Sequence, residues 1–350
     1  MSRYRWLTLV VLVAFFAMGV LYTRPERLTP VSRPCELEKH DGDPWIVPGD
    51  RLDGYCNAEG YVLPGKRTGA FKRIRTDNFL PLDIGFWDKL STTFFCNQAT
   101  FTPSQVKERP TGGIALEIEA VPGVIPPRHD VAPAVPANEG DDPGVWVPPD
   151  LGERAYVSGN IATKDIDYAR YQYGRFEIVL KPPKVSGVLT AFFLHRYDPW
   201  QEIDTEFLGR DTTKMLVNVF YNPGEPGDLY NYGYRGTPVL IDLGFDAADD
   251  FHKYAVEWEQ NELRWFVDDE LVHVRSRNRP TPIPHLPMRL HVNTWPCCSE
   301  ELAGPFDATA LPISAEIKSL NIDAWYPPPL TRLGRVIEGG EWRNKATWIQ

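Results

Sequence analysis

Three carboxylate side chains occupy every second position of one short stretch: Glu202, Asp204 and Glu206. A β-strand points successive side chains to opposite faces, so a strand here places all three acids on one face, with Ile203 and Thr205 on the other. Like charges at this spacing repel, and in a shielded cleft at least one acid then keeps its proton at neutral pH. Such a set suits general acid/base chemistry. The alternative is a solvated strand face, where alternating acids have no function.

The spacing sets a geometric condition on any glycosidase chemistry. Strand positions four apart are separated by about 13 Å at the backbone. Enzymes that cleave glycosidic bonds with retention hold their two carboxyl groups about 5 to 5.5 Å apart. Glu202 and Glu206 would therefore have to lean toward each other across a bound sugar, with the shorter Asp204 between them adjusting their charge.

The composition limits the classes of function. The chain has 350 residues, of which 43% are hydrophobic, and a formal net charge of -10. This length allows one large domain or two modest ones with an ample core. The negative charge argues against a nucleic-acid partner, because phosphate binding needs clustered Lys and Arg. The sequence has neither a zinc-like Cys/His spacing nor a phosphate-binding glycine loop.

The first 23 residues are typical of an export signal or a membrane anchor. Arg3 and Arg5 precede an apolar run from Leu7 to Tyr22. This run is long for a signal-peptide core and short for a spanning helix, which needs about 20 residues; of the two, we favour an uncleaved anchor. The leading arginines favour a cytoplasmic N-terminus, so the remaining chain is expected outside the cytoplasm, anchored to the membrane or secreted.

The cysteine content fits an oxidising compartment, because pairs can form there. The odd number leaves at least one cysteine unpaired. Cys35 and Cys56 are close enough in sequence to pair, whereas the adjacent Cys297 and Cys298 are poorly placed to bridge each other. The remaining pairings stay open; the five cysteines are Cys35, Cys56, Cys96, Cys297 and Cys298.

Short stretches of alternating polarity, separated by turn residues, predict an all-β fold. Asp268-Asp269 is the signature of a hairpin turn within one of them. No stretch has sustained helical periodicity, and many strands without helices between them predict an antiparallel β-sandwich of the jelly-roll type with a concave substrate cleft. The predicted strands are residues 112–120, 159–163, 173–181, 187–195, 202–209, 215–221, 253–259, 262–274, 288–295 and 315–326.

The chain divides into four parts on this evidence. The signal or anchor (1–23) is followed by a Pro/Gly-rich spacer and irregular cap (24–76), a β-sandwich (77–329) and a C-terminal tail (330–350). The proline run after Tyr326 ends the last strand, since proline cannot continue a ladder. Residues 121–150 carry many prolines and no period, which predicts a long loop, a lid or a disordered insertion.

Motifs around the three acids resemble glycoside hydrolase family 16, and in particular its bacterial lichenases (endo-β-1,3-1,4-glucanases). The segment EIDTEFLGRDTTK (202–214) is similar to the family's active-site strand, E-x-D-x-E followed by F-L-G-x-D-T-T-K. The resemblance covers about residues 80 to 326. Further segments similar to family motifs are YGRFE (173–177), FHKYAVEW (251–258), WFVD (265–268) and VNTW (292–295).

The resemblance implies a role for each acid. Glu202 would be the nucleophile, Asp204 its assistant and Glu206 the general acid/base. It also implies sugar-contacting residues, each with a structural alternative such as core packing or the pairing of backbone groups. These are Glu177, Trp200, Asn218, Asn293 and Trp295. One departure is Gln201, where lichenases usually carry an aspartate before the first glutamate.

The expected function is therefore that of a retaining, endo-acting glycoside hydrolase that cleaves a β-linked glucan or exopolysaccharide by double displacement. A transglycosylase on the same polymers and a non-catalytic carbohydrate-binding protein on the same fold are the alternatives. We expect no cofactor, because three acids in a flat row on a strand are a poor cage for Ca²⁺; a structural calcium elsewhere cannot be located from the sequence. The expected partner is a polysaccharide, together with the membrane where the N-terminal segment is retained.

Overall fold

A computed structural model describes residues 69–94, 96–124, 154–165, 170–197, 200–221, 238–276, 282–327, 331–332 and 335–336. Several predictions lie outside these residues: the N-terminal signal or anchor, the pairing of Cys35 with Cys56, most of the loop 121–150 and most of the tail. Within the ranges just given, no helix is long and apolar enough to cross a membrane.

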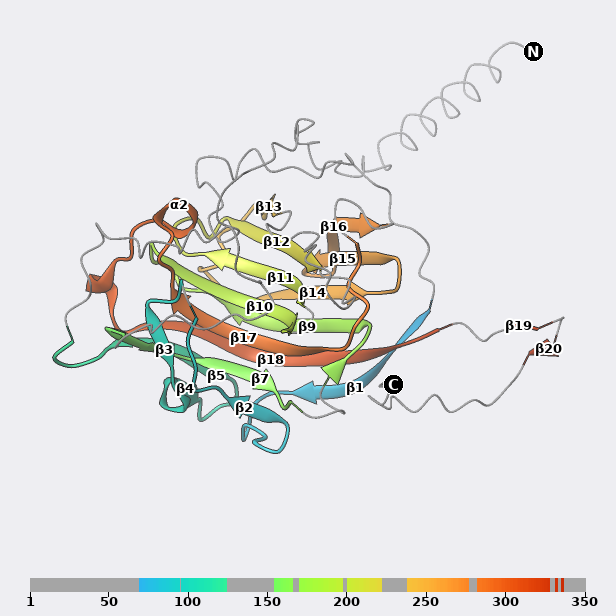
Figure 1. The fold of residues 1–350 in the computed structure, drawn as a ribbon, viewed down its shortest axis with the longest axis horizontal. Helices are drawn as coiled ribbons and strands as arrows, with labels where there is room; N and C mark the ends of the chain where they lie inside the picture. Colours follow the sequence, from blue (N-terminus) through green and yellow to red (C-terminus); the bar gives the residue numbers. More distant parts are fainter. Residues whose placement is uncertain are drawn as a thin grey trace, which may run out of the picture. The chain divides into compact units, whose positions relative to one another are not determined.

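One antiparallel sheet contains β11 (Figure 1). Because β11 carries the three acids, we call this sheet the acid-bearing sheet. β8 (Arg170–Tyr171) pairs with one of its strands, β17, beside the main path. The main path runs in the order β13 (Val239–Asp242), β12 (Lys214–Tyr221), β11 (Gln201–Leu208), β10 (Val188–Arg196), β17 (Met288–Pro296), β7 (Asn160–Thr163) and β2 (Trp87–Lys89).

A second sheet, the supporting sheet, packs against the first. Its β3 and β6 run parallel, and its other neighbouring strands are antiparallel. Its path is β16 (Glu270–Ser276), β15 (Glu262–Val267), β14 (His252–Trp258), β9 (Gly174–Lys181), β18 (Ile313–Tyr326), β5 (Ile114–Ala120), β6 (Tyr156–Ser158) and β3 (Ala99–Phe101), with β1 (Ala70–Asp77) on β18 and β4 (Val106–Glu108) on β5.

Helical structure is confined to short segments among the described residues. They are α2 (Glu300–Ala303) and the 3-10 turns Pro103–Gln105 and Ala308–Ala310. A separate two-stranded pair is formed by β19 (Thr331–Arg332) and β20 (Arg335–Val336).

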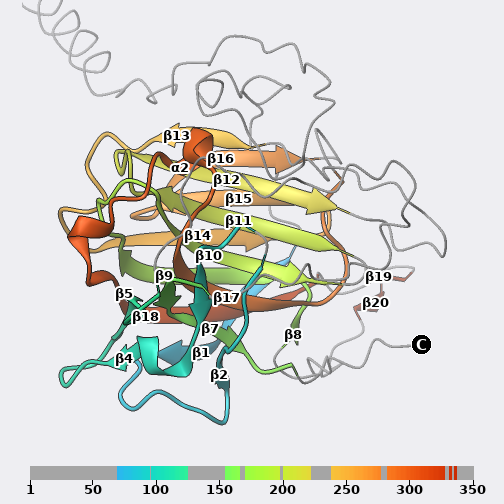
Figure 2. The same cartoon turned by 60° about the vertical axis from the view of Figure 1, so that its left-hand side comes forward.

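The hydrophobic core lies between the two sheets, whose strands run in similar directions (Figures 1 and 2). Ile203 and Phe207 of β11 are each 1% exposed and meet supporting-sheet residues such as Trp265 in the same cluster. Since side chains alternate along a strand, burial of these odd-numbered positions turns the even-numbered acids away from the core. This is the antiparallel jelly-roll sandwich that the sequence predicts.

The predicted strands all form, and so does the predicted hairpin turn. Asp268 and Asp269 have φ angles of 48° and 69°, the left-handed values that a tight type I′ hairpin requires at both positions. The expected start of the sandwich at residue 77 is corrected, because β1 already pairs with β18 from Ala70. Most side chains of β1 are exposed or half-buried, so the strand does not need an alternation of apolar and polar residues. Without that alternation, the sequence did not predict a strand here.

Candidate active site

The three acids point outward from the acid-bearing sheet, onto a surface that we call the acid face. Asp204 is 4% exposed, and Glu202 and Glu206 are half-buried. In antiparallel sheets directly opposed residues point to the same face. Each acid therefore belongs to a row across the sheet, and the rows, read from β12 through β11 and β10 to β17, are Phe220–Glu202–His195–Arg289, Asn218–Asp204–Phe193–His291 and Leu216–Glu206–Ala191–Asn293.

Burial raises the pKa of all three acids, because it penalises their charged forms. The pKa of Glu206 rises to about 7 by this effect. For Asp204, the charges of Glu202 and Glu206 add to the burial effect on the pKa. At neutral pH the row therefore holds protons as well as charge, which is the state that acid/base chemistry requires.

Trp200 distinguishes Glu202 from the other two acids. Its indole Nε1–H donates a hydrogen bond of 2.8 Å to Glu202 Oε2. This bond favours the ionised carboxylate and so opposes the burial effect on the pKa of Glu202. The indole also stacks on Phe220, with ring centroids 4.7 Å apart and planes at 12°. Trp200, predicted as a substrate-binding residue, thus lies beside the candidate nucleophile and holds its orientation.

Gln201, the departure from the lichenase pattern, has a structural partner. Its side chain is 0% exposed, and its Oε1 accepts hydrogen bonds from the backbone N–H groups of His285 (2.9 Å) and Leu286 (3.1 Å). It therefore fastens the segment before β17 to the start of β11. A neutral amide supplies this acceptor without placing a fourth charge beside the acids.

The structure also brings Asn218 and Asn293 to the acid face. Asn218 lies opposite Asp204 on β12 and is 6% exposed. Asn293 lies on β17, separated from Glu206 by Ala191, and is 3% exposed. Because Ala191 carries only a methyl group, no bulky β10 side chain stands between Glu206 and Asn293.

Trp295 is on the same face but is largely covered. It is 8% exposed and packs edge-to-face on Phe94, with ring centroids 4.8 Å apart. Leu208 and Cys297 belong to the same hydrophobic cluster. This environment favours the packing alternative given above over an open platform for a sugar ring.

Glu177 is not part of the acid face, which corrects its predicted role at this site. It lies on β9 of the supporting sheet, between the core residues Phe176 and Ile178, and so points away from the core on the opposite side of the sandwich. Arg175 Nη2 and Asn321 Nδ2 donate hydrogen bonds of 3.0 Å and 2.9 Å to its carboxylate. The glutamate of the YGRFE segment is thus bound within its own sheet.

Among the polar residues of the acid face that were not predicted are His195, His291 and Asn160. His195 lies directly opposite Glu202, and His291 lies opposite Phe193, which faces Asp204. Asn160, on β7, lies opposite Asn293. Strand alternation alone gives each of them a face, but only the pairing register shows that it is the face of the acids.

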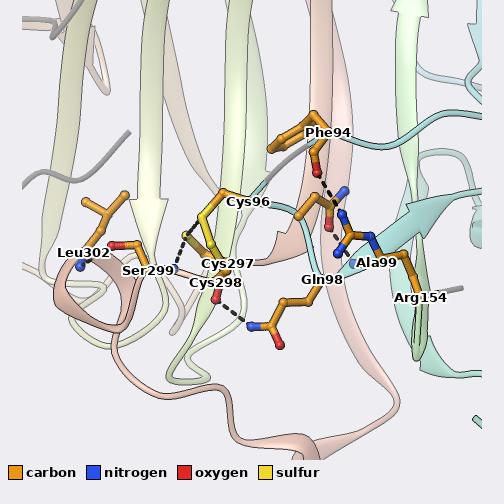
Figure 3. Close-up of a disulfide and its surroundings, with 10 residues drawn as sticks. Phe94, Cys96, Gln98, Ala99, Arg154, Cys297, Cys298, Ser299 and Leu302 are labelled. Carbon is orange, nitrogen blue, oxygen red and sulfur yellow. Dashed lines mark hydrogen bonds between the residues drawn. A yellow bond between two sulfur atoms is a disulfide. The ribbon is translucent and has the colours of Figure 1, made fainter. Parts of the chain in front are cut away.

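A disulfide joins Cys96 to Cys298 beside this site, with Cα atoms 5.0 Å apart (Figure 3). It ties the segment before β3 to the end of β17, the strand that carries Asn293. Cys297 is a buried free thiol whose Sγ lies 3.9 Å from Cys96 Sγ. Burial raises the pKa of this thiol to about 12, so it stays protonated. Cys297 and Cys298 do not bridge each other, as expected.

No metal centre is evident in the part of the chain that the structure describes, where no group of three or more His, Cys, Asp or Glu side chains could hold an ion.

Comparison with known proteins gives the family. Residues 137–308 match the model of glycosyl hydrolases family 16. This domain belongs to glycosyl hydrolases family 16. All three acids lie within the matched residues, and so does β17 with Asn293.

Curated relatives of this family-16 domain are β-glucanases. One from Brevibacillus brevis is 37% identical over 167 residues, which cover 46% of this chain and 58% of the relative. One from Bacillus licheniformis is 37% identical over 129 residues, covering 36% of this chain and 47% of the relative. The chain thus spans about half the length of the curated relatives that it matches.

Solved structures share the family-16 fold. A native glycosidic hydrolase matches with 26% identity and a TM-score of 0.55, covering 76% of this chain and 100% of the other. The Bacillus licheniformis β-glucanase structure, at 24% identity, has a TM-score of 0.53 and covers 73% of this chain and 99% of its own. At 24% identity, the match to the Bacillus licheniformis structure shows a similar fold only.

Proposed function

We propose that the protein is a retaining, endo-acting glycoside hydrolase that cleaves a β-linked glucan by double displacement. The observation that carries the proposal is the row of Glu202, Asp204 and Glu206 on one face of β11, shielded enough to raise their pKa values. The β-glucanase relatives support a polysaccharide substrate.

The two glutamates divide the reaction between them. Glu206 donates its proton to the glycosidic oxygen as the bond to the leaving sugar breaks, while a Glu202 carboxylate oxygen bonds to the anomeric carbon. Glu206, now ionised, then removes a proton from water as the water oxygen attacks that carbon and releases Glu202. Two inversions at one carbon leave its configuration unchanged.

Azide rescue tests the assignment. Glu202→Ala should lose almost all activity, and azide should attack from the vacated side of an activated aryl glycoside, giving a sugar azide of inverted configuration. Glu206→Ala should still form the glycosyl-enzyme from the same substrate, because its leaving group needs no proton. Azide should then give a product of retained configuration, which NMR of the anomeric proton distinguishes.

Asp204→Asn provides the graded control, with a smaller loss than either glutamate variant because Asp204 forms no bond to the sugar. An inverted azide from the Glu206 variant would reverse the assignment. Full activity in both glutamate variants would rule out the enzyme and favour a carbohydrate-binding protein.

One experiment identifies both the polysaccharide that is cleaved and the acceptor, water or sugar, to which the glycosyl group is transferred. A panel of mixed-linkage glucans, β-1,3-glucans and bacterial exopolysaccharides, followed by linkage analysis of the products, identifies the substrate. New reducing ends indicate hydrolysis, whereas products longer than the substrate indicate transfer to sugar.

We propose further that the domain works outside the cytoplasm, with the N-terminal apolar run as its signal or anchor. The Cys96–Cys298 disulfide supports this location, because such bonds persist in oxidising compartments. A reporter fused after Gln350 that is active only in the cytoplasm would contradict it.

A further inference from the structure

An imidazole whose Nε2 has no hydrogen-bond partner among the described residues lies two strands from the acids. His291 is 8% exposed, and its Nε2 has no partner among the described residues. The ring stacks on Phe193, with centroids 4.9 Å apart and planes at 22°. His195 meets it nearly at right angles, with centroids 5.8 Å apart. The aromatic neighbours therefore fix the ring but do not satisfy its nitrogen.

The same patch holds two more unpartnered atoms. Asn160 and Asn293, which are 4% and 3% exposed, each have a side-chain Oδ1 with no hydrogen-bond partner in the described part of the chain. The two residues are directly opposed on β7 and β17, and His291 is two positions along β17 from Asn293. An unsatisfied buried polar group costs about 1–3 kcal/mol, so three in one patch of the acid face indicate that a ligand, or water in its place, completes them.

The charges around His291 indicate the class of this ligand. Burial, followed by the nearby His195 and Arg289, lowers the pKa of His291 well below its usual value, and burial lowers the pKa of His195 to about 4. Both rings are therefore neutral at neutral pH. Arg289 is held by Asp88 Oδ2 at 3.1 Å and by the Thr163 carbonyl at 2.6 Å. The two imidazole rings carry no charge, and Asp88 already balances the charge of Arg289. These surroundings suit an uncharged hydroxyl group of the ligand better than an acidic substituent.

We propose that His291 is a specificity-determining residue that hydrogen-bonds, through Nε2, a hydroxyl of an uncharged sugar unit lying across β17 beside the acids. The inference rests on the proposed function and adds a subsite to it. His195, which meets His291, also lies edge-on to Tyr197, and Tyr197 is 67% exposed.

The test compares His291 with a second buried histidine. His291→Phe keeps an aromatic ring and removes the nitrogen; His291→Gln keeps a donor and acceptor. The matched control is His273→Phe, because His273 is also neutral and unpartnered at Nε2 but lies on β16 of the supporting sheet, against Trp265. Each change is made in the full chain with active Glu202 and again with Glu202→Ala, so that binding of glucan oligosaccharides is measured by calorimetry without turnover.

We expect His291→Phe to raise KM and the oligosaccharide Kd about 2- to 10-fold, the effect of one neutral hydrogen bond, with little change in kcat. His291→Gln should recover part of the affinity, and His273→Phe should leave KM and Kd unchanged. Equal KM and Kd in wild type and both His291 variants would overturn the inference alone, as would an equal loss in His273→Phe. A wild type that neither cleaves nor binds any glucan would overturn the proposed function as well.

Discussion

Glu202 and Glu206 have the same side chain but different neighbours, which matches the different roles proposed for them. Glu202 receives the indole N–H of Trp200, a bond that favours its charged form. For Glu206, burial is what raises the pKa, and this favours the protonated form near neutral pH. Burial raises the pKa of both acids, to about 8 for Glu202 and about 7 for Glu206, so the indole donor directed at Glu202, and not burial, distinguishes the candidate nucleophile from the candidate proton donor.

Trp200→Phe tests this difference, because phenylalanine can keep the stack on Phe220 while removing the donor. Loss of a hydrogen bond to a charged group costs about 1.5–3 kcal/mol, so kcat/KM should fall about 10- to 100-fold. The pKa of Glu202 should rise, which moves the acidic limb of the pH–rate profile to higher pH. An unchanged profile with normal activity would show that the indole does not orient the nucleophile.

Glu206→Gln should stabilise the fold at neutral and alkaline pH. An acid whose pKa rises from 4.5 to about 7 on folding binds its proton more tightly in the folded state, so stability declines as pH rises through this interval. Removing the charge should gain on the order of 1–3 kcal/mol at pH 8 and nothing at pH 4, as thermal melts at both values would show.

Glu316→Gln is the control, because it should change the stability at pH 8 in the opposite direction. Burial acts to raise the pKa of Glu316, but its hydrogen bonds with Arg109 outweigh this and lower it. Its neutralisation should therefore lower the melting temperature at pH 8. A gain in both variants would indicate a general charge effect unrelated to the active site.

β17 contributes to the site and to the packing beside it. Asn293 and His291 lie toward its middle, and Trp295 near its end packs on Phe94. Trp295→Ala should therefore cost about 3–5 kcal/mol of unfolding free energy, as large-to-small changes in a core do. Denaturant titration measures this loss. A stable variant with only a raised KM would instead restore the sugar-stacking role that the resemblance implied.

The sequence predicted which strands form better than it predicted which strands lie next to each other in a sheet. Period-two alternation located β11 and the face of its acids, since alternation is a property of the strand alone. β1 was missed because it is a polar edge strand. Glu177 was misplaced and His291 overlooked for a common reason: which strands pair, and in what register, depends on contacts between residues far apart in sequence.

At the scale of the whole molecule, the Cys96–Cys298 bond links positions 202 residues apart. Cys96→Ala should lower stability by about 2–5 kcal/mol, a typical cost of removing a native disulfide. Cys298→Ala should cost less, because Cys297 Sγ, 3.9 Å from Cys96 Sγ, can take its place. Peptide mapping without reductant should then find Cys96 joined to Cys297. A free Cys96 in that variant would show that the substitute bond does not form.

The same bond gives the part of the chain that carries the three acids the covalent topology of a ring with two tails. All three acids lie on the ring between Cys96 and Cys298. A single protease cut between these cysteines would leave two peptides that the disulfide still joins into one branched molecule, so no fragment would be released. The cut protein would run as one piece until a reductant was added and as two afterwards, and the halves of the active site would stay tethered in between.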